Sequence, residues 1–130
     1  MAKLKVYSYQ VGPVCTNCYF AANTETKEAI IIDPGAAADY LIEQIEKEGL
    51  RPVAVLLTHG HFDHATAAAD VASYFGVQIY AHELEKETLE NPALNLCAMA
   101  GTSGLVFHAD VFVKDGEMLD LAGFSIRVLH

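Results

Sequence analysis

The chain has 130 residues, and 8 basic against 17 acidic side chains give it a formal net charge of −9 at pH 7. Nucleic acids and anionic membranes are bound largely through clustered Lys and Arg, so this charge argues against either as a partner. With 52% hydrophobic and 19% charged residues, the composition excludes a disordered chain and predicts a packed core.

The first half of the chain predicts a three-stranded meander followed by a helix. The three strand-like segments are residues 3–11, 18–23 and 28–33. After Asp33-Pro34-Gly35, apolar residues recur on one face of a helix over residues 39–48, and Gly49 ends this helix. The pattern is typical of an amphipathic helix that packs against a sheet.

The second half predicts helices and strands in alternation. Residues 52–57 form a short apolar run, which suits a central strand buried on both faces. The next expected elements are a helix over residues 65–75 that ends at Gly76, a strand over 78–81 and a charged helix over 82–89. From Val111 on, two strands flank the turns at residues 115–116 and 122–123, the last over 124–129. This order predicts an α/β fold with a mixed α+β sheet.

The expected cellular location and number of domains rest on features that the sequence lacks. No apolar run approaches the roughly 18 residues of a membrane helix, and polar residues interrupt any signal-peptide core near the N-terminus. Three cysteines, an odd number, do not make the disulfide framework of a secreted domain. We therefore expect a cytoplasmic protein with one domain over residues 1–130.

The most informative stretch, Thr58-His59-Gly60-His61-Phe62-Asp63-His64, follows the expected central strand. Loops at strand ends often carry functional sites, and imidazole with carboxylate at this density suits Zn, Fe, Mn or Ni. The loop can turn His59 and His61 toward one ion, while Asp63 and His64 face another. The alternative is a polar loop whose histidines only cap the following helix.

The pattern His59-x-His61-x-Asp63-His64 resembles the signature of the metallo-β-lactamase fold superfamily. Flanking segments narrow the resemblance to its glyoxalase II-like, or hydroxyacylglutathione hydrolase-like, branch. These segments are residues 16–19, 32–35, 57–64, 115–117 and 128–130. The resemblance implies an αββα sandwich, of which this chain is the N-terminal half, with one or two metal ions at one edge.

The resemblance further implies a metal-dependent hydrolase that acts on a small-molecule thioester or related acyl bond. His59 and His61 would ligate the first ion, and Asp63 and His64 the second, with zinc expected and iron or manganese as alternatives. Asp63 would also orient the metal-bound hydroxide that attacks the carbonyl. Asp33 either supports the site by orienting an imidazole or only shapes the turn after its strand.

The superfamily's remaining ligands lie beyond the matching region, so the resemblance implies that the chain is truncated at its C-terminal end. His130 resembles the histidine that precedes a later ligand, not the ligand itself. We therefore expect weak metal binding and little or no turnover from this chain alone. We also expect self-association, through the open sheet face or the edge at residues 124–130.

Other interpretations remain open beside the hydrolase. One is a non-catalytic metal-binding fragment, and another is an iron persulfide dioxygenase of the same fold. Flavo-diiron relatives are disfavoured because they carry Glu where this chain has His61, and the flanking segments disfavour a lactamase. The Cys15-x-x-Cys18 pair is a weaker redox or zinc candidate, because no second pair follows. His82 and His108 are interpreted as structural or surface histidines.

Overall fold

The structure is a computed structural model of the chain, and it describes residues 4–11, 16–58, 67–85 and 109–128. Eight strands are present in these ranges: β1 Leu4–Val11, β2 Thr16–Asn23, β3 Glu28–Ile32, β4 Arg51–Leu57, β5 Gln78–His82, β6 Val111–Val113, β7 Met118–Leu121 and β8 Phe124–Arg127. The helical elements are α1 Ala38–Lys47, α3 Ala68–Phe75 and a single 3₁₀ turn, η1 Glu83–Glu85.

The main sheet is mixed, as the sequence predicted. Its six strands run in the order β1-β2-β3-β4-β5-β6, and β7 and β8 form a separate two-stranded sheet. Strands β1, β2 and β3 form the expected antiparallel meander, whereas β3, β4, β5 and β6 are parallel to one another. Parallel neighbours need a crossover, which α1 supplies between β3 and β4 and α3 between β4 and β5. The predicted α/β fold is confirmed.

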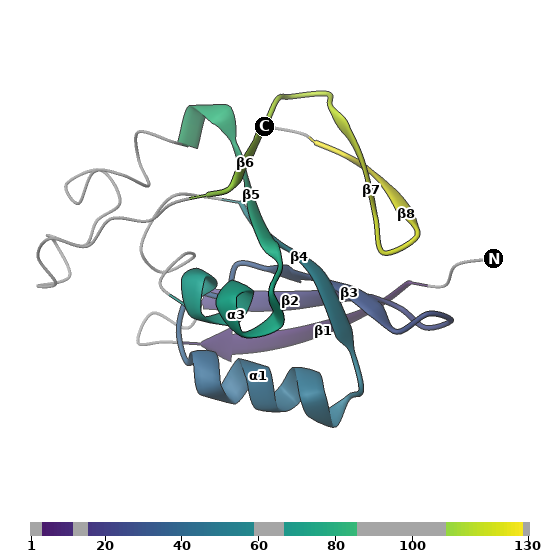
Figure 1. Cartoon of the computed structure of the whole chain (residues 1–130), viewed down its shortest axis with the longest axis vertical. Coiled ribbons are helices and arrows are strands. Elements are labelled where there is room, and N and C mark those ends of the chain that lie inside the picture. Colours follow the sequence, from purple (N-terminus) through teal and green to yellow (C-terminus); the bar gives the residue numbers. More distant parts are fainter. Residues whose placement is uncertain (1–3, 12–15, 59–66, 86–108, 129–130) are drawn as a thin grey trace, which may run out of the picture.

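The core lies between α1, α3 and one face of the main sheet (Figure 1). Helix α1 buries Leu41 and Ile45 completely, and their spacing of four places both on the face toward the sheet. The strand register aligns buried side chains of this sheet face in one row: Phe20, Ile31, Val55 and Ile79. Strand β4 lies between β3 and β5, so the predicted central strand is confirmed.

The β7–β8 hairpin lies on the side of the main sheet away from the helices (Figure 1). The side-chain amide of Asn23, 2% exposed, donates to the Ala122 carbonyl at 2.9 Å and so ties the hairpin turn to the end of β2. The Asn23 Oδ1 also accepts from the amides of Glu25 and Thr26. One buried side chain therefore fixes two turns to each other.

Gly123 follows Ala122 in this turn and packs tightly against Asn23. A Cβ at Gly123 would lie 2.7 Å from the Asn23 Nδ2, whereas a Cβ at Gly116 would meet no atom within 4 Å. Both glycines have positive φ values, 81° and 83°, so backbone strain is similar at the two sites. We expect Gly123→Ala to lower the free energy of unfolding by about 1–3 kcal/mol more than Gly116→Ala, as urea unfolding would measure. Equal losses would show that the Asn23 contact contributes nothing.

Three sequence predictions in the second half need correction or lie partly outside the described residues. The helix expected over residues 82–89 is wrong at its start, because His82 is the last residue of β5 and is paired with Val113, and Glu83–Glu85 form a 3₁₀ turn. Residues 86–89 lie outside the described residues. The helix expected from residue 65 is described from Ala68 and ends at Gly76 as predicted. After Val111 the structure has three strands, and the first of them joins the main sheet.

The sheet face away from the helices carries exposed apolar side chains at its β1 edge. Leu4 and Val6 are 60% and 54% exposed, and they alternate with residues that face the core. Self-association through this face stays a prediction. Within the described ranges, no helix is long and apolar enough to cross a bilayer.

Candidate metal centre

The structure describes none of the four predicted ligands, which are His59, His61, Asp63 and His64. Asp63 is also the residue with the predicted catalytic role. Within the ranges that the structure places, no group of three or more His, Cys, Asp or Glu side chains could hold a metal ion. The ligand assignment therefore stays a prediction. The described residues show how the chain is held on either side of residues 59–66.

Both ends of the connection over residues 59–66 are fixed to one turn. Before it, the Thr58 amide donates to Asp33 Oδ1 at 2.7 Å, and the Thr58 hydroxyl donates to Asp33 Oδ2. After it, the Ala67 amide donates to the Pro34 carbonyl at 3.0 Å. Two adjacent residues, Asp33 and Pro34, thus hold the chain where it leaves β4 and where it enters α3.

The Asp33 side chain reaches Thr58 because of the way β3 ends. Asp33 has a φ of 53° and is only 4% exposed. A positive φ is uncommon outside glycine, but Asp tolerates it because its short side chain can hydrogen-bond locally. Its own amide donates to the Leu56 carbonyl at 2.9 Å, which continues the β3–β4 pairing. Asp33 therefore does more than shape a turn, whereas its proposed contact with an imidazole stays a prediction.

The polar residues at this place share one edge of the sheet. Because β3, β4 and β5 are parallel, their carboxyl ends meet there, and such edges commonly hold ligands in α/β proteins. Asp33 follows β3, Thr58 follows β4 and His82 ends β5. His82 is 7% exposed, so of the two alternatives, a structural or a surface histidine, the structural one fits. The alternation of Gln78, Tyr80 and His82 could have revealed it as a strand residue.

Cys18 is a buried side chain of β2 with no accessible surface. Burial, and secondarily the Asp33 carboxylate, raise the pKa of its thiol to about 12. The thiol therefore stays protonated at neutral pH, and a protonated thiol is a poor nucleophile and a poor metal ligand. This agrees with a structural cysteine and speaks against the Cys15-x-x-Cys18 redox or zinc interpretation, of which Cys15 lies outside the described residues.

A cavity of about 240 Å³ opens at the same edge, on the sheet face away from the helices. The ends of β3, β4, β5 and β6 form its floor, and the β7–β8 hairpin forms its roof. Its polar lining residues are Thr58, which follows β4, His82 at the end of β5, and Arg127 at the end of β8. The cavity is thus continuous with the strand ends from which residues 59–66 depart.

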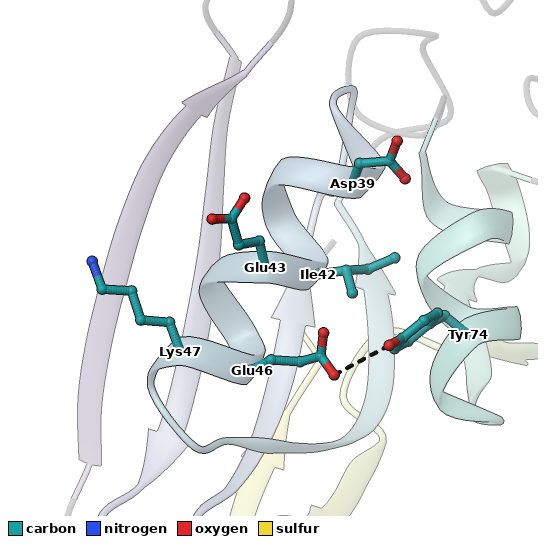
Figure 2. A pocket seen from close by; sticks show the side chains of 6 residues that line it. All are labelled: Asp39, Ile42, Glu43, Glu46, Lys47 and Tyr74. Atoms are coloured by element: carbon teal, nitrogen blue, oxygen red, sulfur yellow. Dashed lines mark hydrogen bonds between the residues drawn. The ribbon is translucent and has the colours of Figure 1, made fainter.

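A hollow of about 420 Å³ lies between α1 and α3 (Figure 2). Asp39, Ile42 and Glu46 point from α1 toward α3, and the Tyr74 hydroxyl donates to Glu46 Oε2 at 3.1 Å. This hydrogen bond to the carboxylate raises the pKa of Tyr74. Among the described residues that line this hollow there are carboxylates but no histidine, so they do not form an imidazole-rich centre.

Comparison with known proteins identifies similar chains. A family model described as Metallo-beta-lactamase superfamily matches residues 11–130. Hydroxyacylglutathione hydrolase GloC of Haemophilus influenzae is 40% identical over 121 residues, which cover 88% of this chain and 54% of GloC. The crystal structure of the B3 metallo-beta-lactamase BLEG-1 matches with a TM-score of 0.88 and 36% identity, over 97% of this chain and 61% of that chain. TTHA1623 in a di-iron-bound form matches with a TM-score of 0.70 and 31% identity, over 87% of this chain and 56% of that chain.

These similarities reach more than one branch of the family. A hydroxyacylglutathione hydrolase and a lactamase both match this chain above 30% identity. The chain spans between 54% and 59% of the length of three curated relatives that it matches.

Proposed function

The chain belongs to the metallo-β-lactamase superfamily, whose members bind metal ions, and from this we propose that it is a hydrolase of the glyoxalase II-like type, acting on thioesters or related acyl bonds. The observation that carries the proposal is that Thr58 and Ala67, on either side of the histidine-rich connection, are hydrogen-bonded to Asp33 and Pro34 at the carboxyl edge of the sheet. The 40% identity to GloC favours the thioester branch over the others.

The residues of the connection fit a transition-metal centre. Three imidazoles and a carboxylate are the donors that zinc, iron and manganese prefer. Hydrogen bonds hold Thr58 and Ala67, which stand on either side of these donors in the chain. We assign His59 and His61 to a first ion and Asp63 and His64 to a second, with zinc as the first candidate. Catalytic zinc usually has three protein ligands, so two for each ion predict weak binding by these residues alone.

The proposed reaction is the hydrolysis of a thioester. When bound, an ion would supply Lewis acidity and would lower the pKa of a bound water molecule to about 7. The Asp63 carboxylate orients the attacking water and accepts its proton. The water oxygen bonds to the acyl carbon, the carbon–sulfur bond breaks, and the thiolate leaves with the bonding electrons and is then protonated. A thiolate is a stable leaving group, so the site needs no separate strong general acid.

The test compares substrates on the zinc-loaded chain and on a form that continues past His130. S-acetyl-N-acetylcysteamine serves as the thioester, nitrocefin as the β-lactam, and a glutathione persulfide with oxygen uptake as the dioxygenase probe. We expect zinc-dependent thiol release from the thioester, strongest in the longer form, and none after chelation. Preferential turnover of nitrocefin, or oxygen uptake with the persulfide, would contradict the proposed activity. Metal uptake with no turnover in either form would favour a non-catalytic metal-binding protein.

A further inference from the structure

Strand β1 is an edge strand of the main sheet, and it is long and regular. All eight of its residues, from Leu4 to Val11, pair with β2 without a shift in register. Within the described ranges no second strand lies beside β1, because the sheet runs in the order β1-β2-β3-β4-β5-β6. Alternate N–H and C=O groups of β1 therefore point away from β2, in the arrangement with which a further strand can pair.

This edge lacks most of the features that keep edge strands of natural sheets from pairing. Such features are a very short strand, a proline, a β-bulge or several charged side chains. Strand β1 contains no proline, its pairing with β2 has no bulge, and Lys5 is its single charged residue. The edge is therefore suited to pairing with another strand.

The charge of the chain is distributed so that a second copy can approach this edge. The chain carries 17 acidic side chains, and the first of them in the sequence is Glu25. Strands β1 and β2 therefore contain no carboxylate, although the net charge of the chain is −9. Molecules with the same large net charge repel each other. At the β1 edge a second copy meets no opposing carboxylate from either strand.

The sequence of β1 is complementary to itself in one antiparallel register. Opposite residues of an antiparallel pair share a face of the sheet, so a two-fold axis passes through a residue and not between two. With the axis at Tyr7, this residue lies opposite its copy, and Lys5 lies opposite Tyr9 of the second copy. An axis at Ser8 would place Lys5 opposite Val11 instead. Within one chain the Lys5 Nζ lies 4.8 Å from the centre of the Tyr7 ring, so ammonium–aromatic contacts fit this edge.

Helix α1 adds charge complementarity to the register with the axis at Tyr7. The rings of Tyr9 and Tyr40, a residue of α1, lie edge to face with their centres 6.0 Å apart. Burial raises the pKa of the Tyr9 hydroxyl, and the Glu48 carboxylate at the end of α1 raises it further, so this carboxylate acts on Tyr9. Lys5 of the second copy, opposite Tyr9, therefore approaches an acidic group.

We propose that the β1 edge is a homodimer interface, at which two copies pair antiparallel through β1 around a two-fold axis at Tyr7 and join their main sheets. This interface differs from the sheet face and from the edge at residues 124–130, the two surfaces for which the sequence predicted self-association. It consists of backbone groups and side chains of β1, and it does not depend on the proposed function. An interface of one strand pair is small, so its affinity is modest.

Sedimentation velocity tests for the dimer, on this chain and on the form that continues past His130. A chelator is present, so that no shared metal ion links two copies. We expect both forms to dimerise with a Kd below about 100 µM. Amide hydrogen exchange then identifies the surface: the alternate amides of β1 that point away from β2 should exchange more slowly as the protein concentration rises.

Two lysine variants separate the edge from the rest of the sheet. Ser8→Lys places a charge on the exposed edge, where the two copies of residue 8 are diagonal neighbours across the axis, and should weaken dimerisation at least about fivefold. Asn17→Lys is the matched control, because Asn17 is also exposed and pairs with Gln10, which places it on the same face but one strand away from the edge. It makes the same change in net charge and should leave the dimer unchanged.

A charge exchange tests the register. Lys5→Glu should weaken dimerisation about tenfold, because in both halves of the dimer it replaces an attraction to Glu48 by a repulsion. Adding Glu48→Lys to the same chain should restore most of the affinity. Circular dichroism checks that each variant is folded.

Four results would overturn the proposal. They are a monomer up to about 1 mM protein, equal effects of Ser8→Lys and Asn17→Lys, exchange of the β1 amides that does not depend on concentration, and no recovery with Glu48→Lys. A dimer of the shorter form alone would also overturn it, and would point to association through the sheet face away from the helices.

Discussion

His61→Ala is expected to lower the affinity of the chain for Zn²⁺ by more than about 100-fold and to abolish zinc-dependent thioester hydrolysis. Loss of a residue that merely supports a ligand already lowers metal affinity roughly 10–100-fold, so loss of a ligand exceeds that range. Competition with a chromophoric chelator would measure the affinity, and thiol release the hydrolysis. The variant should unfold at the same urea concentration as the parent chain when both are metal-free.

His108→Ala is the matched control, because it removes an imidazole that lies outside the histidine-rich connection. We expect zinc affinity and hydrolysis to stay within about twofold of the parent values, since no ligand is lost. Equal losses in the two variants would mean that zinc binds to histidines in general and not to a site at residues 59–64.

Asp33→Ala is expected to produce the largest loss of stability outside the apolar core, about 2–4 kcal/mol of unfolding free energy. It removes the acceptor for the Thr58 amide and hydroxyl, and hydrogen bonds to a charged acceptor contribute roughly 1.5–3 kcal/mol. It also leaves alanine at a φ of 53°, which is unfavourable for a residue without a local hydrogen bond. Zinc affinity should fall roughly 10–100-fold, because the connection loses one of its two attachments.

Asp33→Asn distinguishes the hydrogen bonds from the backbone strain. Asparagine tolerates positive φ and keeps one carbonyl acceptor for Thr58, so about 1 kcal/mol of destabilisation is expected, with most of the zinc affinity retained. Urea unfolding and the chelator competition measure both quantities. If Asp33→Ala changed neither by a measurable amount, the Asp33 attachment would have no part in the site.

Local patterns in the sequence predicted most of the fold. The meander, the amphipathic helix and the buried central strand were confirmed because each depends on the period of apolar residues within one segment. The start of the helix expected from His82 was wrong, because the Glu and Lys residues that follow have high helix propensity, while the pairing of β5 with β6 extends the strand to His82. Pairing of this kind depends on residues about 30 positions away and is invisible to a local pattern.

The sequence predicted the donors of the candidate site, an assignment that stays a prediction, but not the hydrogen bonds that hold the residues on either side of it. The density of imidazoles pointed to residues 59–64 without any structure. The attachment of Thr58 to Asp33 spans 25 positions, and its existence depends on the parallel pairing of β3 with β4. The cavity under the β7–β8 hairpin likewise depends on how distant segments pack, and no local sequence motif predicts it.

X-ray absorption at the zinc edge of the zinc-loaded chain tests the central claim most directly, because it reports the atoms bound to the ion. The account predicts nitrogen and oxygen neighbours at about 2.0–2.2 Å with multiple scattering typical of imidazole, and its loss in His61→Ala. A sulfur neighbour at about 2.3 Å, or a spectrum unchanged by His61→Ala, would contradict a metal centre formed by His59, His61, Asp63 and His64.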